Sequence, residues 1–288
     1  MLSNIKLFKL ILVSFLLFTS LLVNINNAKG QAAVMPKTKV IPKSNLQLSK
    51  RLLKAPPIKS EWSAGFRLQS DGWALFADIG TAVKFNSKYP NYQYQTNLFQ
   101  IEFAEKTDIR QKLTINTNSS SSSSNALGYV FGKVNKFYQA RMSYGQRLKI
   151  AGKPDPQSAS IHWLFAGGLS IGVVKPYKII ALVNDPIMGY VEKTIQYEPA
   201  YREVFLNPDL IFGSAGFADG LNQLKYIPGL HLKTGIHFDF SKEKTTILAA
   251  EIGASVDFYS NPIQIMLDDQ NKKTFANMYV SFQFGKRK

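Results

Sequence analysis

Residues 229–240 read GLHLKTGIHFDF, in which apolar and polar side chains alternate almost one for one. Successive side chains of a β-strand point to opposite faces, so this pattern predicts a strand with one apolar and one polar face. The apolar face carries Leu230, Leu232, Thr234, Ile236, Phe238 and Phe240. The polar face carries His231, Lys233, Gly235, His237 and Asp239. The fold then depends on which of these faces points inward.

The same alternation recurs after residue 60 and predicts an all-β chain. Eight stretches carry it: residues 61–69, 72–83, 93–105, 135–146, 160–173, 229–240, 246–259 and 274–284. The longest links, near 106–134 and 174–228, fall at the same end of the strands, whereas SKEKT at 241–245 is a tight turn at the other end. Short inner turns and long outer loops are typical of outer-membrane barrels. Residues 177–197 could add a hairpin and raise the count to ten, and 200–206 predicts one short helix.

The composition of the polar face indicates that it lines a narrow lumen. It is rich in Gly, Ala and Ser and has one or two charges per strand, whereas a water-facing surface usually carries more Lys and Glu. An eight-stranded barrel has room inside for small side chains and a few large ones. We therefore expect a transmembrane antiparallel up-and-down β-barrel, most simply of eight strands. A soluble barrel of the lipocalin kind, with the faces reversed, is the alternative.

A polar network is predicted to fill this lumen. Its members are Arg67, Asp78, Glu102, Arg141, His162, His231, Lys233, His237, Asp239, Glu251 and Asp257. Opposite charges inside a closed lumen need partners, and these nearly balance.

The histidines and serines of this face raise the question of a catalytic or metal site. His231 and His237 are six residues apart on one strand, about 20 Å, so they cannot share a metal ion. A site built from His162, Asp239 and one of these histidines, or a hydrolase using Ser160 or Ser170 with His162, remains an alternative. The interpretation favoured by the pattern is a hydrogen-bonded network with no catalytic residue, cofactor or metal.

The N-terminal residues predict export. Lys6 and Lys9 precede an uncharged run, residues 10–23, and Ala28 and Gly30 fit a cleavage site, so residues 1–30 read as a signal peptide. Residues 31–60 contain seven Lys or Arg and no acid, and predict a flexible, disordered basic arm in the periplasm. The barrel would then span residues 61–288. The absence of cysteine excludes disulfides and a lipoprotein anchor.

The C-terminal strand ends NMYVSFQFGKRK, and Phe282 and Phe284 resemble the aromatic insertion signal of outer-membrane barrels, although four residues follow. Together with GFRLQSDGWALFADIG, AGKPDPQSASIHW, FAGGLSIGVVKPY and IPGLHLKTGIHFDF, this end resembles a family of uncharacterised Bacteroidota outer-membrane β-barrel proteins. The resemblance spans roughly residues 60–288. It implies a barrel and an outer-membrane location, and it assigns no catalytic residue.

These features predict a non-enzymatic anchor or accessory subunit of an envelope complex. A small porin is the first alternative, and a lipid-modifying enzyme of the outer membrane is the second. The expected partners are outer-membrane lipids and lipopolysaccharide, the barrel assembly machinery during insertion, and an envelope protein complex. An exported protein rarely meets nucleic acid, so no nucleic-acid partner is expected despite the net charge of +16.

Overall fold

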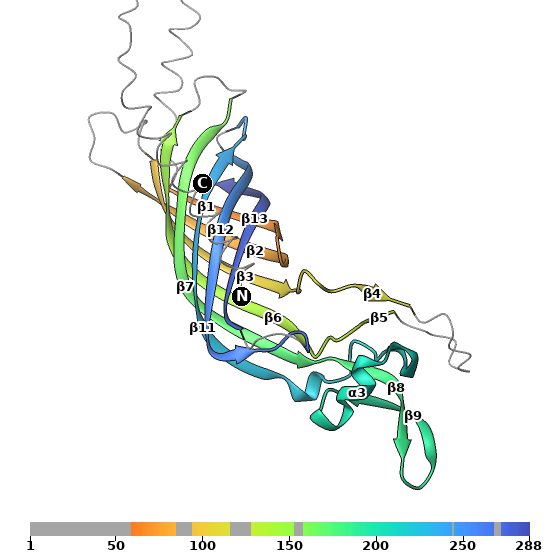
Figure 1. The fold of residues 1–288 in the computed structure, drawn as a ribbon. Coiled ribbons are helices and arrows are strands. Elements are labelled where there is room, and N and C mark those ends of the chain that lie inside the picture. Colours follow the sequence, from red (N-terminus) through yellow and green to blue (C-terminus); the bar gives the residue numbers. More distant parts are fainter. Residues whose placement is uncertain (1–58, 85–93, 116–127, 153–157, 244, 268–271) are drawn as a thin grey trace, which may run out of the picture. The chain divides into compact units, whose positions relative to one another are not determined.

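The computed structural model describes residues 59–84, 94–115, 128–152, 158–243, 245–267 and 272–288. Within these ranges eight long strands pair antiparallel and close into a barrel (Figure 1). In sequence order they are β1 (Ser60–Gln69), β2 (Gly72–Lys84), β3 (Tyr94–Lys106), β6 (Asn135–Ala151), β7 (Ser160–Pro176), β11 (Lys225–Asp239), β12 (Thr246–Ile263) and β13 (Lys272–Arg287). Each strand pairs with the next along the chain, and β13 returns to β1. The predicted up-and-down barrel of eight strands is confirmed.

The strands overlap the eight predicted segments but several run further. β6 continues to Ala151, β11 begins at Lys225, and β13 reaches Arg287. The predicted boundaries stopped where clear alternation stopped. Backbone pairing, unlike side-chain alternation, continues beyond that point, because it needs only a neighbouring strand with free N–H and C=O groups.

The side chains are inverted relative to a soluble barrel. Apolar residues of the outward face are largely exposed, as for Ile79 at 62% and Leu169 at 65%, whereas Arg67, Arg141 and His237 are at most 1% exposed. A closed barrel satisfies its backbone hydrogen bonds between strands, so such an outer surface can face hydrocarbon. The chain therefore forms a transmembrane barrel.

Aromatic side chains mark both edges of the apolar band. Toward the end that carries both termini of the barrel, Trp62 and Trp163 are exposed on the outward face. Toward the other end, one register row joins Trp73, Glu105, Tyr138, Val173 and Tyr226 across five strands. On β7 the two levels are ten residues apart, about 33 Å along the strand. With the usual tilt this matches the band of about 25 Å that a membrane barrel presents.

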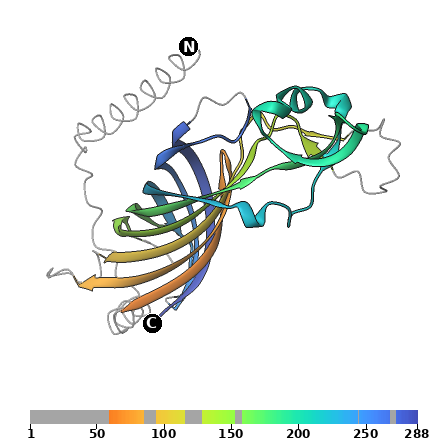
Figure 2. The same cartoon turned by 90° about the horizontal axis from the view of Figure 1, so that it is seen from below.

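The two long links gather at the end of the barrel away from its termini, and we call residues 128–134, 177–224 and 264–267 the loop lobe. It contains β5 (Tyr129–Val130), which pairs with β4 (Leu113–Thr114), and β8 (Lys178–Asp185), β9 (Gly189–Gln196) and β10 (Ile211–Ser214) in a separate sheet. Single helical turns, Pro199–Tyr201, Pro208–Leu210 and Leu221–Gln223, accompany the short helix α3 (Arg202–Leu206). Figure 2 shows these elements, mostly in teal, beyond the ends of the barrel strands.

The loop lobe has an apolar core of its own. It is formed by Tyr129, Val134, Tyr177, Ile179, Ala181, Ile195, Phe205, Ile211 and Leu267. The hairpin predicted near 177–197 is β8–β9, and it pairs with β10 rather than with the barrel. The alternative of ten barrel strands is therefore wrong, and the predicted short helix near 200–206 is confirmed.

Two sequence predictions fall outside the described residues: the signal peptide and residues 31–58 of the basic arm. Among the helices that the structure describes, none is long and apolar enough to cross a membrane.

Two glycines make room for one large side chain inside the barrel. Gly235 and Gly253 are register partners on β11 and β12, and Tyr279 of β13 lies against both. A Cβ at Gly253 would come within 2.6 Å of the Tyr279 hydroxyl and would also clash with the Thr234 carbonyl oxygen. The Tyr279 hydroxyl in turn donates to Glu251 Oε1 at 2.8 Å.

Gly253→Val is expected to destabilise the barrel by about 2 kcal/mol, because overfilling a packed interior displaces Tyr279 and its partner. Ala254→Val is the matched control, since Ala254 is exposed on the outward face of the same strand. Urea unfolding of the protein in vesicles, followed by tryptophan fluorescence, compares them. Equal midpoints for the two variants would contradict the interior packing described here.

Candidate functional site in the barrel interior

All eleven side chains predicted for the polar network are buried in the barrel. At its centre Arg67 of β1 and Arg141 of β6 each donate to a different oxygen of Glu102 on β3. Arg141 also reaches across to β12, where Nε and Nη2 bind the Asp257 carboxylate at 3.0 and 2.6 Å. Because charge-assisted contacts of this kind are strong, they tie four strands together through the lumen.

Aromatic rings support the central arginine from the other side. The Arg67 guanidinium lies 4.6 Å from the ring centroid of Phe76 and 4.4 Å from that of Tyr279. Arg67 Nη2 is also 3.8 Å from Glu251 Oε1. The Arg67 guanidinium is thus held by carboxylates and by two aromatic rings together.

A second layer of ion pairs, nearer the chain termini, was missed by the sequence analysis. Arg147 of β6 donates to Glu61 of β1 at 2.7 Å, and its other terminal nitrogen is 3.7 Å from Asp78. Arg287 of β13 donates to Glu61 at 3.0 Å and to Asp239 at 2.6 Å. The available signal was strand parity. Arg147 follows the predicted lumen residue Arg141 by six positions and so shares its face, and Arg287 follows Gln283, which the structure buries, by four.

Lys233 belongs to a polar chain rather than to a close ion pair. Its ammonium donates to the amide oxygen of Gln100, and Gln100 Nε2 donates to Asp78 at 2.5 Å. Asp78, one of the predicted lumen acids, is therefore linked to Lys233 through Gln100, a residue that was not predicted as part of the network.

The three histidines take part in the same network. His231 Nδ1 lies 2.9 Å from Asp257, and His237 Nδ1 lies 3.3 Å from Glu251. His162 faces His237 edge-on, with ring centroids 5.8 Å apart, and Asp239 pairs with Arg287. Within the described ranges no cluster of three His, Asp or Glu is arranged to hold a metal ion.

The serines weighed as nucleophiles are also buried here. Ser170 Oγ is 2.8 Å from the hydroxyl of Tyr259, which accepts from Gln139 at 2.7 Å. Ser160 lies opposite Asp239 in the β7–β11 register. The contacts of Ser170 therefore join it to a tyrosine and a glutamine, as expected of a lumen-filling network.

Summed over the described lumen, the ion pairs nearly neutralise one another. The cations are Arg67, Arg141, Arg147, Lys233 and Arg287, and the carboxylates are Glu61, Asp78, Glu102, Asp239, Glu251 and Asp257. At the loop end, Lys106 closes the interior by binding both oxygens of Asp71 at 2.6 Å. Long charged side chains therefore occupy the space along the barrel axis.

The two residues predicted as an insertion signal lie on the outward face of β13. Phe282 and Phe284 are exposed and pair in register with Phe66 and Ala64 of β1. The strand does not end there, because Gly285–Arg287 continue the ladder to β1. The tail that departed from the usual signal is thus part of the barrel wall.

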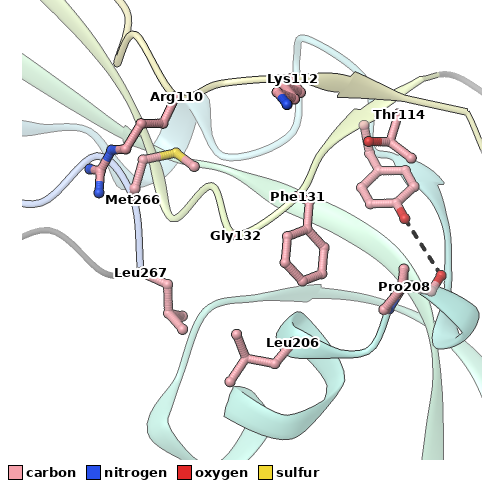
Figure 3. Close-up of a pocket in the computed structure, with 10 residues that line it drawn as sticks. Arg110, Lys112, Thr114, Phe131, Gly132, Leu206, Pro208, Met266 and Leu267 are labelled. Carbon is pink, nitrogen blue, oxygen red and sulfur yellow. Dashed lines mark hydrogen bonds between the residues drawn. The ribbon is translucent and has the colours of Figure 1, made fainter.

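A separate cavity of about 420 Å³ lies in the loop region (Figure 3). Phe131, Leu206 and Met266 give it apolar walls, and Arg110 and Lys112 add positive charge. Nearby, burial lowers the pKa of Lys133 to about 8, with the charge of Lys136 as a secondary cause. The loop region therefore combines apolar surface with cations.

Comparison with known proteins adds one fold likeness. No family model matches the chain, and no curated protein matches it. Among solved structures, two of Ail, the attachment invasion locus protein of Yersinia pestis, align over 81% of this chain and all of theirs, with a TM-score of 0.33. Sequence identity is 9% for one and 11% for the other, which is in complex with the heparin analogue sucrose octasulfate. At this TM-score the barrel assignment rests on the strand pairing itself.

Arg67→Ala is expected to lower the free energy of unfolding by about 3–5 kcal/mol, because it leaves Glu102 and Glu251 buried with fewer counter-charges. Arg110→Ala is the control: this arginine pairs with Asp108 but is half exposed, so its removal should cost no more than about 1 kcal/mol. Denaturant midpoints in vesicles measure both. Similar losses for the two arginines would mean that the lumen pairs contribute no more than surface pairs.

Proposed function

We propose that this chain is a non-enzymatic anchor of the outer membrane that presents its loop lobe to an envelope complex as an accessory subunit. The observation that carries the proposal is the contrast between a lumen filled by charged side chains and a loop lobe with its own core. A barrel with a filled interior would anchor the loop lobe rigidly in the membrane, and the lobe would supply a contact surface outside the membrane.

The filled lumen argues against the porin alternative. A conducting eight-stranded barrel would need a continuous water path, but Arg67, Glu102 and Arg141 meet at the centre and Arg141 spans to Asp257. Opening a path would separate buried charges from their partners, which is costly in a low-dielectric interior.

The tip of the β8–β9 hairpin favours a role in contacts. Ile187 is 92% exposed, Met188 78% and Tyr190 68%. The turn is preorganised, because Asp185 Oδ1 accepts from the backbone N–H groups of Ile187 and Met188 at 2.9 and 3.3 Å. These hydrogen bonds lower the pKa of Asp185. A fixed apolar tip loses little conformational entropy when a partner covers it.

The location and remaining partners belong to the same proposal. An outward apolar band, with the two longest links at the end away from the chain termini, suits a bacterial outer membrane, with those termini in the periplasm. The exposed Phe282 and Phe284 suit recognition by the barrel assembly machinery. The resemblance to uncharacterised Bacteroidota barrels and the expected contact with lipopolysaccharide stay predictions. A lipid-modifying activity remains the competing proposal, and turnover of a labelled phospholipid by the purified protein would establish it.

In planar bilayers the purified protein is expected to give no stable single-channel steps, because the lumen pairs block a water path. Another eight-stranded barrel protein, refolded in the same detergent, serves as the control for insertion into the bilayer and for non-specific leak of ions. Reproducible steps from the wild-type chain would favour the porin alternative.

Crosslinking in intact cells, followed by purification from the outer membrane, is expected to recover this chain with a protein partner. The double variant Ile187→Ser/Met188→Ser should lose that partner while its barrel still inserts. The control Ile109→Ser/Leu113→Ser removes two other exposed apolar side chains, one between β3 and β4 and one in β4, and should retain it. Recovery of the wild-type chain alone would contradict the accessory role.

A further inference from the structure

Two lysines stand opposite each other on the outward face of the barrel, just beyond the aromatic row at the loop end. Lys136 of β6 and Lys175 of β7 are register partners. Each lies two residues past that row, beyond Tyr138 and Val173, which is about 7 Å further along the strand. This is the level at which lipid headgroups begin, because aromatic side chains of membrane barrels mark the interface.

Both ammonium groups converge on one ring. Lys175 Nζ lies 4.4 Å and Lys136 Nζ 5.7 Å from the ring centroid of Phe217, a residue that is itself exposed. Lys136 Nζ is also 6.0 Å from the ring of Tyr177. Two like charges are thus held at one place by cation–π contacts.

These charges lack a close carboxylate among the described residues. Lys175 is only 2% exposed, and its ammonium donates to the backbone carbonyl of Phe217. Of the charged groups that act on it, Lys136 and Lys178 repel, and the exposed Asp219 attracts without forming an ion pair. The acid in the aromatic row, Glu105, accepts from Trp73 Nε1 at 3.1 Å.

Like charges directly opposite on one sheet face destabilise the pairing, so their juxtaposition calls for a counter-ion. An ammonium has three donors, and Lys175 uses one of them on Phe217. A phosphate supplies several acceptor oxygens and the missing negative charge. Lys136, which is half-buried, matches the way lysine side chains reach toward headgroups, whereas Phe217 covers the ammonium of Lys175.

We propose that Lys136 and Lys175, beside Phe217, bind the phosphate of an anionic membrane lipid at the loop end of the barrel. The inference rests on the membrane placement in the proposed function and adds a defined lipid contact to it. Free inorganic phosphate offers the same acceptor chemistry. The lipid is favoured because both strand positions lie on the outward face, directly above the apolar band, and Phe217, which covers Lys175, is itself exposed there.

Native mass spectrometry of the full chain, purified in detergent, tests this with phosphatidylglycerol, phosphatidylcholine and inorganic phosphate as probes. Wild-type protein should retain phosphatidylglycerol in preference to phosphatidylcholine. Lys136→Gln/Lys175→Gln should weaken phosphatidylglycerol binding by about fivefold per lysine, given the usual contribution of a basic residue near an anionic surface. Lys225→Gln/Lys273→Gln, which removes two exposed lysines elsewhere at the loop end, should change it less than twofold.

Three results would overturn the site. They are equal retention of the two lipids, equal losses in the two double variants, or inorganic phosphate displacing phosphatidylglycerol at equal concentration. Folding is checked by the mobility difference between unheated and boiled samples on detergent gels. If the double variant fails that check, the single change Lys136→Gln at the half-buried lysine replaces it. Loss of lipid preference in a folded barrel leaves the anchor proposal intact, whereas release of the wild-type chain without detergent would contradict both.

Discussion

The structure depends on the closure of the first barrel strand against the last. In hydrocarbon an unpaired strand edge would leave a row of N–H and C=O groups without partners, so the sheet must join its own ends. Here β1 and β13 pair from Glu61–Arg287 to Gln69–Tyr279, across more than 200 residues of sequence. The ion pair between Glu61 and Arg287 lies at the terminal end of this seam. Closure therefore brings together side chains from both ends of the barrel chain.

Closure also dictates what the interior must contain. Eight strands enclose a space that side chains fill, and outward positions must be apolar, so inward positions carry the polar groups. Once buried, these groups need partners, which explains why Glu102 serves two arginines and Asp257 serves Arg141 and His231. Buried pairs of this kind add little net stability over apolar packing. Their main effect is on register, since a slip of one residue would turn each charge toward lipid.

Most of the sequence prediction rested on the alternation of apolar and polar side chains along each strand. Alternation located all eight strands and put eleven side chains on the face that the structure buries. It could not supply partners, because partners depend on register between strands distant in sequence. Arg67 was expected among acids, but only the barrel shows that Glu102, rather than the acid on its neighbouring strand, Asp78, is its main contact. Arg147, Glu61 and Arg287 were missed because they lie at strand ends, where alternation fades while backbone pairing continues.

In the loop lobe the sequence predicted local elements but not their arrangement. Its hairpin and short helix were visible as local patterns, but the alternation of apolar and polar side chains could not decide whether the hairpin joined the barrel. That choice depends on long-range packing: Ile179, Ala181 and Ile195 of the hairpin bury themselves against Phe205 and Ile211. The hairpin thus folds around an apolar core like a water-soluble domain, while the barrel beneath it is polar inside and apolar outside. The two hydrophobic patterns reverse near Lys175 and Tyr177, the same level at which the lysine pair stands. At this level the chain passes from the hydrocarbon of the membrane into water. Aromatic rings and lysine side chains suit this interface, because each combines an apolar part with a polar end.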